Sequence, residues 1–381
     1  MTVNWGYIFQ QGIMLLVVGI IIALLRFVLR AMGVRQQPSC LWLWLELITL
    51  SPLFYLLGRH CLGLGWGSLL PGRVLPFFVG VNLVFYWLAI IWPLRVFWNR
   101  RKSGSELARN ITVGTAVIFV LGAIYACFVE PLLLDRDHRE LRFEEIGRNP
   151  VRIAHISDLQ LIDLGPRENS LVRAVNDFEP HIIVMSGDYI CAQLSEETAI
   201  AAARSVISRL QASHGIYATT SDSETLEQRL MIFKGLDVHY LLNKSTVVEI
   251  EGVKVRIGGV NHYAPRWSRT CGKATDDELF IVACHTPDYA EETHARIPET
   301  DLYLCGHTHG GQVQIPWMGP IVTFTRKTPR HIAAGGLFET ASGMPFAVSR
   351  GIGMEGNYAP RVRFNCRPHL FLLTLRGDKA R

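Results

Sequence analysis

The sequence lacks a basic tract, zinc-ribbon cysteines and internal repeats, and each absence argues against a class of proteins. No basic tract is interleaved with aromatic residues and the net charge is only +5, so nucleic acid is not an expected partner. The later part of the chain has an odd number of cysteines without zinc-ribbon spacing, which argues against that metal motif and against a strongly oxidising compartment. These cysteines are Cys191, Cys271, Cys284, Cys305 and Cys366. No internal repeat or low-complexity segment is present.

Long apolar runs, by contrast, are frequent in the first third of the chain. Four of them approach or exceed the roughly 20 residues that cross about 30 Å of hydrocarbon. They are residues 5–25, 41–57, 75–98 and 111–134. No charged segment precedes the first run and further runs follow it, so a cleaved signal peptide is a poor alternative. We therefore predict a membrane domain with about four transmembrane helices in residues 1–134, and buried helices of a soluble protein are the alternative.

The basic residues between these runs predict an orientation. Arginine and lysine are concentrated between the first and second runs and between the third and fourth, whereas the loop between the second and third has only Arg59 and Arg73. The positive-inside rule places the first and third loops in the cytoplasm. Both termini, and with them everything after residue 135, are then expected on the outside.

The remainder of the chain has the pattern of a globular α/β domain. Residues 135–150 are charged and alternate, so we expect a connector that becomes an edge strand. Residues 151–381 contain short apolar runs that alternate with amphipathic segments and later follow one another as strands. This order predicts two mixed sheets packed face to face. Cys284 and Cys305 lie inside apolar runs, where we expect them to pack as small hydrophobic residues.

Four of the predicted strands end in turns that carry acids or imidazoles. These residues are Asp158 in "SDLQ", Asp188 in "SGDY", His285 in "CHTPD", and His307 and His309 in "GHTHGG". Loops at the ends of rigid strands are common places for ligands, and mixed oxygen and nitrogen donors suit Mn, Fe, Zn or Mg. "GHTHGGQ" is the most specific of the four, because three glycines around two histidines make a poor packing unit. The sequence therefore predicts a metal site.

These motifs identify a family resemblance. Residues from about 150 to the end resemble the calcineurin-like metallophosphoesterases, and most of all the membrane-associated bacterial subgroup typified by YkuE and YaeI. The similarity rests on "ISDLQL", "SGDY", "GIYATTSDSE", "CHTPD" and "GHTHGGQVQIP", with "FVEPLLL" and "VSRGIG" in support. The resemblance implies a four-layer αββα sandwich in residues 151–381, and a bacterial inner or cytoplasmic membrane as the location.

The resemblance also implies a dinuclear metal site. One ion is expected on Asp158, Gln160, Asp188 and His309, and the other on Asp188, Asp222, His285 and His307. Two divalent ions in such enzymes hold the phosphoryl oxygens and lower the pKa of the water that attacks phosphorus, so no Ser-His-Asp arrangement is required.

Three residues depart from the family pattern. Gln160 stands where a histidine is expected, and its amide binds borderline metals less strongly than imidazole does. Asp222 replaces an asparagine, which is a mild change. Ser223 replaces the histidine that stabilises the transition state or protonates the leaving group, and its hydroxyl cannot do so at neutral pH. Glu224 and His262 are potential substitutes, although an ordinary loop role is the alternative for each.

Three functional hypotheses follow from the sequence. The first is a membrane-anchored phosphoesterase that hydrolyses a phosphomonoester, phosphodiester or diphosphate of a lipid-linked substrate. That substrate is a lipid-carrier phosphate or phospholipid head group outside the cell, or a nucleotide diphosphate-linked acyl sugar inside it. The second, motivated by Gln160 and Ser223, is a catalytically silent metal-binding domain that senses or scaffolds at the membrane. The third, a transporter, rests on the apolar runs alone. Arg350 has a fork that suits phosphate, but a structural ion pair is its alternative role.

Overall fold

The computed structural model describes residues 106–191, 195–221, 223–262, 265–266, 275, 277–323, 325–355 and 361–377. Three of the predicted membrane runs, at residues 5–25, 41–57 and 75–98, lie outside this part of the chain, and so does Asp222. The chain divides into two compact units, one made of residues 1–124 and 357–360 and the other of residues 125–356 and 361–381. Helix α5, Glu106–Ile124, is the described part of the first unit.

One apolar helical stretch is described in the first third of the chain. A π-helical turn, η4 (Tyr125–Val129), and a 3₁₀ turn, η5 (Glu130–Leu132), follow α5 directly in the sequence. Within these elements, the 20 residues Val113–Leu132 are long and apolar enough to cross a membrane, and only 17% of the most apolar window is buried. It coincides with the fourth predicted run. A membrane region with four helices remains a prediction.

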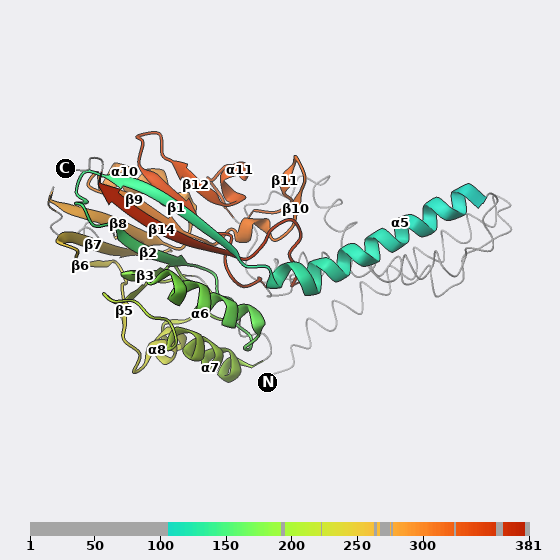
Figure 1. Ribbon diagram of the computed structural model, residues 1–381, viewed down its shortest axis with the longest axis horizontal. Coiled ribbons are helices and arrows are strands. Elements are labelled where there is room, and N and C mark those ends of the chain that lie inside the picture. Colours follow the sequence, from blue (N-terminus) through green and yellow to red (C-terminus); the bar gives the residue numbers. More distant parts are fainter. Residues whose placement is uncertain are drawn as a thin grey trace, which may run out of the picture. The chain divides into compact units, whose positions relative to one another are not determined.

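The second unit is built around two six-stranded sheets (Figure 1). The first sheet has the order β1-β14-β2-β3-β4-β5. Its strands are β1 (Asp135–Phe143), β2 (Val151–Ile156), β3 (Ile182–Met185), β4 (Ile216–Ala218), β5 (Val238–Tyr240) and β14 (His369–Gly377). Strands β2 to β5 are parallel, and β14 runs antiparallel to β2. The edge strand expected within residues 135–150 is β1, which pairs in parallel with β14 and begins at Asp135, so the connecting turn follows the strand instead of preceding it.

The second sheet has the order β12-β13-β9-β8-β7-β6. Its strands are β6 (Lys244–Ile250), β7 (Val253–Val260), β8 (Glu278–Cys284), β9 (Leu302–Cys305), β12 (Gly336–Glu339) and β13 (Pro345–Val348). Strands β7, β8, β9 and β13 are parallel, while the outer strands β6 and β12 are antiparallel to their neighbours. The prediction of two mixed sheets is confirmed. A short hairpin, β10 (Gln314–Ile315) and β11 (Gly319–Pro320), stands apart from both sheets.

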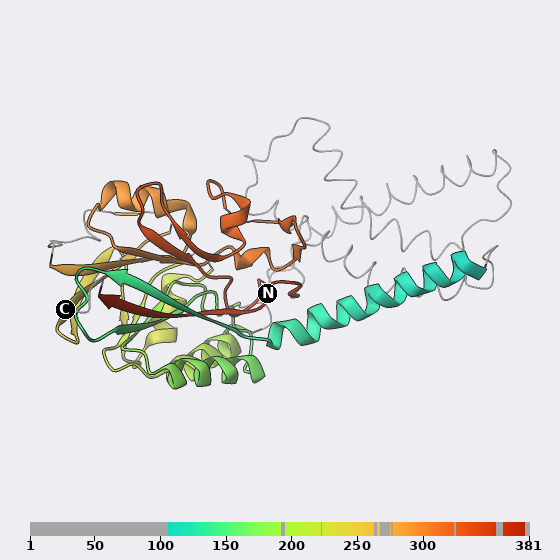
Figure 2. The same ribbon diagram turned by 45° about the horizontal axis from the view of Figure 1, so that its top comes forward.

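Helices cover the outer faces of the sheets, as the two views show (Figure 2). Helices α6 (Pro166–Phe178), α7 (Glu196–Ile207) and α8 (Leu226–Phe233) share an apolar cluster with one face of the first sheet. Helix α10 (Ala290–Arg296) shares another with the far face of the second sheet, and the short α11 (Arg330–Ala333) precedes β12.

Strand β8 shows why the sequence folds into layers. Its alternate residues Leu279, Ile281 and Ala283 lie in the cluster between the two sheets. The intervening Phe280, Val282 and Cys284 face α10 on the other side. Because successive strand residues point to opposite faces, a continuous apolar run is required where both faces are covered. Cys284 is a free, buried cysteine in this outer cluster, as is Cys305 of β9, so the packing role predicted for both is confirmed.

Candidate metal centre

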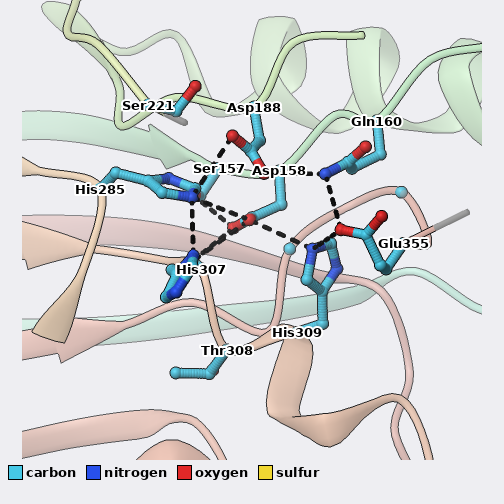
Figure 3. Close-up of polar contacts among 12 residues, drawn as sticks. Ser157, Asp158, Gln160, Asp188, Ser221, His285, His307, Thr308, His309 and Glu355 are labelled. Atoms are coloured by element: carbon cyan, nitrogen blue, oxygen red, sulfur yellow. Dashed lines mark hydrogen bonds and ion pairs between the residues drawn. The ribbon is translucent and has the colours of Figure 1, made fainter. Parts of the chain in front are cut away.

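The carboxyl ends of four parallel strands deliver the predicted ligands to one place (Figure 3). Asp158 and Gln160 follow β2, Asp188 follows β3, His285 follows β8, and His307 and His309 follow β9. Because β2 pairs with β3 and β8 with β9 in parallel, their ends share an edge of each sheet. Asp158, Gln160, Asp188, His285 and His309 are almost completely buried.

The donor atoms of these residues face one another closely. The Nε2 atom of His285 lies 3.4 Å from Oδ1 of Asp188 and 3.9 Å from Oδ1 of Asp158. The same Asp158 oxygen lies 3.4 Å from Nε2 of His309. Nδ1 of His307 lies 3.1 Å from Nε2 of His285, whose Nδ1 is 3.0 Å from the carbonyl of Ser186. A carbonyl only accepts, so Nδ1 of His285 carries the proton and Nε2 is left to bind a cation.

Two groups of side chains in the described residues can each hold an ion. Asp158, Asp188 and His285 form one group, and Asp188, His309 and Glu355 form the other. The ligand atoms within each group lie within 4.8 Å of one another, and Asp188 belongs to both. Among the described residues, Oδ1 of Asp188 and both ring nitrogens of His309 are buried without a hydrogen-bond partner. Buried polar atoms are nearly always paired, so these atoms fit a site that receives cations.

The backbone at the site is held in an unfavourable conformation. Five candidate ligands have positive φ: Asp158 at 49°, Gln160 at 42°, Asp188 at 56°, His307 at 69° and His309 at 49°. Left-handed backbone costs a residue with a side chain roughly 1–3 kcal/mol, and such residues gather at functional sites. Residue-type preferences alone would place glycine at these turns. The surrounding sheets therefore hold these side chains inward at an energetic cost.

Gly306 permits the two halves of the site to meet. A Cβ atom at this position would lie 1.9 Å from Oγ of Ser157 and 2.1 Å from Oδ2 of Asp158. The backbone N–H of His307 donates to both carboxylate oxygens of Asp158, at 3.1 and 3.0 Å. The first glycine of "GHTHGGQ" is thus required by the close approach of the β9 turn to the β2 turn.

The site is electrostatically short of positive charge. Burial raises the pKa of Asp158 to about 7, and the negative charge of Asp188 acts in the same direction. Burial also acts to raise the pKa of Asp188, but the imidazoles of His285 and His307 outweigh it and hold that pKa below its usual range. Burial, assisted by the charge of Arg363, lowers the pKa of His309, which favours the neutral imidazole that binds metal. A divalent cation would offset the excess of negative charge.

Glu355 is a candidate ligand that was not predicted from the sequence. Its Oε2 atom lies 4.0 Å from Nε2 of His309 and 3.4 Å from Nε2 of Gln160, which donates to it. Glu355 lies seven residues after the end of β13, in the turn that follows "VSRGIG". That motif supports the family resemblance but does not indicate a metal ligand. Only the folding of this turn against Asp158–Gln160 brings the carboxylate to the site.

The two proposed substitutes for the missing histidine differ in the structure. Glu224 is buried, accepts hydrogen bonds from the backbone N–H groups of Tyr189 and Ile190, and accepts a 2.7 Å bond from Oγ of Ser221. It therefore supports the β3 turn. The ring of His262 lies 5.1 Å from that of His307 and 5.6 Å from that of His285, centroid to centroid. Of the two, His262 is the one whose ring stands beside the histidines of the site.

Arg350 takes the structural alternative. Its Nη2 atom donates to the carboxylate of Asp135 at the start of β1, and Nε donates to the backbone carbonyl of Arg367 at 3.4 Å. The guanidinium is therefore engaged with the β1 edge. Together with Glu130 and Cys366, Arg350 lines a surface cavity of about 310 Å³.

Comparison with known proteins supports the family resemblance. No family model matches the chain. The uncharacterized metallophosphoesterase YkuE of Bacillus subtilis is 28% identical over 273 residues, which cover 66% of this chain and 89% of YkuE. Phosphodiesterase YaeI of Escherichia coli is 24% identical over 290 residues, which cover 73% and 99%. The chain is a distant homologue of YkuE and YaeI.

A protein with "transmembrane" in its name is also similar to the chain. A transmembrane protein with a metallophosphoesterase domain from Danio rerio is 24% identical over 339 residues, covering 78% of this chain and 75% of that protein. Among solved structures, a dimetal phosphatase from Danio rerio is 11% identical with a TM-score of 0.33, over 53% of this chain and 88% of that one. A novel archaeal phosphodiesterase is 14% identical with a TM-score of 0.30, over 53% and 84%.

Proposed function

We propose that the protein is a membrane-anchored, dinuclear metal-dependent phosphoesterase that hydrolyses a phosphate ester or diphosphate of a lipid-linked substrate. The observation that carries the proposal is the convergence of Asp158, Asp188, His285 and His309 at the ends of parallel strands. Within the described residues, Oδ1 of Asp188 and both ring nitrogens of His309 are buried there without a hydrogen-bond partner. Bound divalent ions would supply Lewis acidity to the phosphoryl group and a water of lowered pKa.

The residues of this chain have separable tasks in such a reaction. Asp188 lies in both candidate groups and is suited to bridge two cations. His285, fixed by the carbonyl of Ser186, keeps its Nε2 atom directed at Asp188. The ring of His262 lies beside that of His307 and can donate a hydrogen bond to a phosphoryl oxygen. It would thereby take the role of the histidine that Ser223 replaces. A substrate with a good leaving group, such as a diphosphate, depends least on an added acid.

An exposed apolar hairpin supports a lipid-linked substrate. Trp317 at the tip of the β10–β11 hairpin is fully exposed, and Met318 and Ile321 are more than half exposed. The hairpin begins five residues after His309, and Nε2 of Gln314 at its base donates to the carbonyl of Gly310 at 3.0 Å. Tryptophan and aliphatic side chains at the end of a polar domain suit the interface of a bilayer.

The base of this hairpin is joined to the end of the apolar helical stretch. Gln314 N–H donates to the carbonyl of Phe364 at 2.9 Å, and the ring of Phe364 packs edge to face with that of Tyr125 in η4 at 6.3 Å. Asn365 N–H donates to the carboxylate of Glu130 in η5 at 2.8 Å. Glu130 thus caps a turn of the domain. These contacts join the hairpin to the η4 and η5 turns of the same unit.

The proposal is tested with the full chain purified in detergent. Wild type is expected to contain metal and to release p-nitrophenol from bis(p-nitrophenyl) phosphate when Mn²⁺ is added. Asp188→Ala is expected to lose both metal and activity, because it removes the shared ligand. Bound metal without turnover of any phosphodiester, diphosphate or lipid phosphate would overturn the enzyme and leave the silent metal-binding domain.

The side of the membrane requires a separate measurement. Alkaline phosphatase, which is active only outside the cytoplasm, is fused after residue 140 of the chain. Activity of the fusion is expected from the distribution of basic residues. An inactive fusion would place the domain inside and favour a nucleotide diphosphate-linked acyl sugar over a lipid-carrier phosphate.

A further inference from the structure

The candidate ligands fall into two sets of different chemistry. The rings of His285 and His307 lie 4.8 Å apart, with His262 beside both, on one side of Asp158 and Asp188. Gln160 and Glu355 lie on the other side, together with His309 (Figure 3). One side thus offers mainly imidazole nitrogens, whereas the other offers an amide, a carboxylate and one imidazole.

The turn that carries Glu355 is built against the first ligand turn. Ile352 N–H donates to the carbonyl of Ser157 at 3.1 Å, and Gly353 N–H donates to that of Asp158 at 2.7 Å. A Cβ atom on Gly353 would lie 2.2 Å from the carbonyl oxygen of Leu159, so the two turns are in direct backbone contact.

Two arginines and a glutamine fix the same turn further. Arg361 donates to the carbonyl of Met354 at 2.8 Å and to that of Gln160 at 3.3 Å, joining the two turns. The completely buried Arg363 donates to the carbonyls of Gly351 and Gly353, and Glu355 N–H donates to the side chain of Gln312. Glu355 is therefore held beside Gln160 by the backbone and does not depend on chance contact of a long side chain.

Several buried polar atoms of the other candidate ligands have no hydrogen-bond partner among the described residues, and a bound cation would contact them. Oδ1 of Asp188, Oε1 of Gln160 and Nε2 of His309 are buried and make no hydrogen bond to any described residue. Glu355 can place a carboxylate oxygen within 4.8 Å of the ligand atoms of Asp188 and His309. A half-turn of the Gln160 amide exchanges Nε2 and Oε1, so this side chain can offer either a donor to the carboxylates or an oxygen to a cation.

We propose that Glu355 is a metal ligand and that it forms an oxygen-rich cation position with Gln160, Asp158, Asp188 and His309. The inference rests on the proposed phosphoesterase function for the use of the bound ion. Hard cations such as Mn²⁺ and Mg²⁺ prefer oxygen ligands, whereas imidazole favours zinc and iron. Glu355 thus adds a carboxylate at the position where Gln160 replaces the expected histidine. The two cation positions therefore differ in the metal that they prefer.

The experiment measures metal binding, independently of activity. The metal-stripped full chain in detergent is titrated with Mn²⁺ alone, bound ions being followed by electron paramagnetic resonance, and in parallel with Zn²⁺ alone. The variants are Glu355→Gln, Gln160→His and the double variant, with Glu339→Gln as the matched control. Glu339 is an exposed acid at the end of β12, outside both candidate groups.

Glu355→Gln is expected to lower the affinity for one of the two bound Mn²⁺ ions at least about 10-fold, since even a partner outside the first coordination shell typically contributes that much. The affinity for the second Mn²⁺ should not change. Gln160→His is expected to shift the same position towards Zn²⁺, and in the double variant Zn²⁺ binding is retained while Mn²⁺ binding stays weak. Glu339→Gln should bind as wild type does. Unchanged Mn²⁺ binding by Glu355→Gln would overturn the inference.

The failure of this inference is distinguishable from failure of the proposed function. Wild type that hydrolyses phosphodiesters while Glu355→Gln binds Mn²⁺ normally would refute the Glu355 ligand alone. If the wild type turns over no phosphoester but the Glu355→Gln variant binds one Mn²⁺ fewer, only the proposed phosphoesterase activity would be refuted.

Discussion

The side-chain amide of Gln160 donates a 2.8 Å hydrogen bond from Nε2 to Oδ2 of Asp188. One of the three residues that depart from the pattern of the resembled family therefore contacts the carboxylate shared by both candidate metal groups. We expect the metal-free protein to depend on this bond. Gln160→Leu replaces the amide by an apolar side chain of similar size and removes the Gln160 donor to the Asp188 oxygen, which typically costs about 1–3 kcal/mol.

The measurement for Gln160→Leu is thermal unfolding with and without Mn²⁺. The variant should be less stable than wild type without metal, because an Asp188 oxygen has lost its donor. Mn²⁺ should widen the difference, since Gln160 is also a proposed ligand and the variant then binds the cation more weakly. Equal stability of the two metal-free proteins would contradict this role for the amide.

His262 is expected to act on the substrate and not on the fold. Its ring lies 5.1 Å from that of His307, on the histidine side of the site. His262→Ala should lower kcat by roughly 100-fold, the lower range for the loss of a positioned hydrogen-bonding group, with Mn²⁺ content unchanged. His262→Gln, which keeps an N–H donor, should recover part of the loss. Loss of metal from His262→Ala would instead assign this residue as a ligand.

Gly306 should tolerate no side chain. The added Cβ of Gly306→Ala meets Oγ of Ser157 and Oδ2 of Asp158, so the Asp158 carboxylate must move. We expect a loss of about 1–3 kcal/mol in the free energy of unfolding and weaker Mn²⁺ binding. Gly147→Ala is the control, because an added Cβ there meets no atom within 4 Å. If both variants bind Mn²⁺ as wild type does, the close approach at Gly306 is not required.

The hairpin tip should matter for lipid substrates only. In the double variant Trp317→Ser/Met318→Ser, the exposed apolar surface of the tip is removed without touching a candidate ligand. KM for a lipid phosphate presented in vesicles is expected to rise about 10-fold, as the lost interfacial burial of two large side chains implies. Hydrolysis of bis(p-nitrophenyl) phosphate should not change. An equal effect on both substrates would exclude a lipid-specific role of the hairpin.

A carboxyl group outside the site gives a pH-dependent prediction. Asp301 accepts a 2.7 Å hydrogen bond from Phe280 N–H, and burial, assisted by the charge of Glu145, raises its pKa to about 6. The folded state therefore binds this proton more tightly than the unfolded state does. The stabilisation is complete below the unfolded pKa of about 4 and is lost as pH rises through about 6.

Asp301→Asn removes that loss while its amide oxygen still accepts the same hydrogen bond. The variant should be more stable than wild type at about pH 7.5, by no more than about 1 kcal/mol because the group is partly solvated, and no more stable at about pH 4. The difference between the unfolding temperatures of the two proteins at each pH tests this. A difference that does not vary with pH would contradict the shifted pKa.

The sequence was informative where chemistry follows a strand. Asp158, Asp188, His285, His307 and His309 each stand just after a buried apolar run, and parallel pairing brings such ends together. Glu355 could not be predicted in this way, because its position depends on the contact of Gly353 with the Leu159 carbonyl, almost 200 residues earlier in the chain. The partner of Arg350 was equally out of reach, since Asp135 meets it only through the pairing of the first and last strands.

The left-handed backbone at the candidate ligands has a consequence for how these positions evolve. Asp158, Asp188 and His309 occupy angles that glycine would adopt without strain, so relaxed selection would let these positions drift towards glycine or asparagine. Such drift would raise stability while emptying the site. Retention of acids and imidazoles there, in this chain and in any relative compared with it, separates lineages that still hold a cation from those that have kept only the fold.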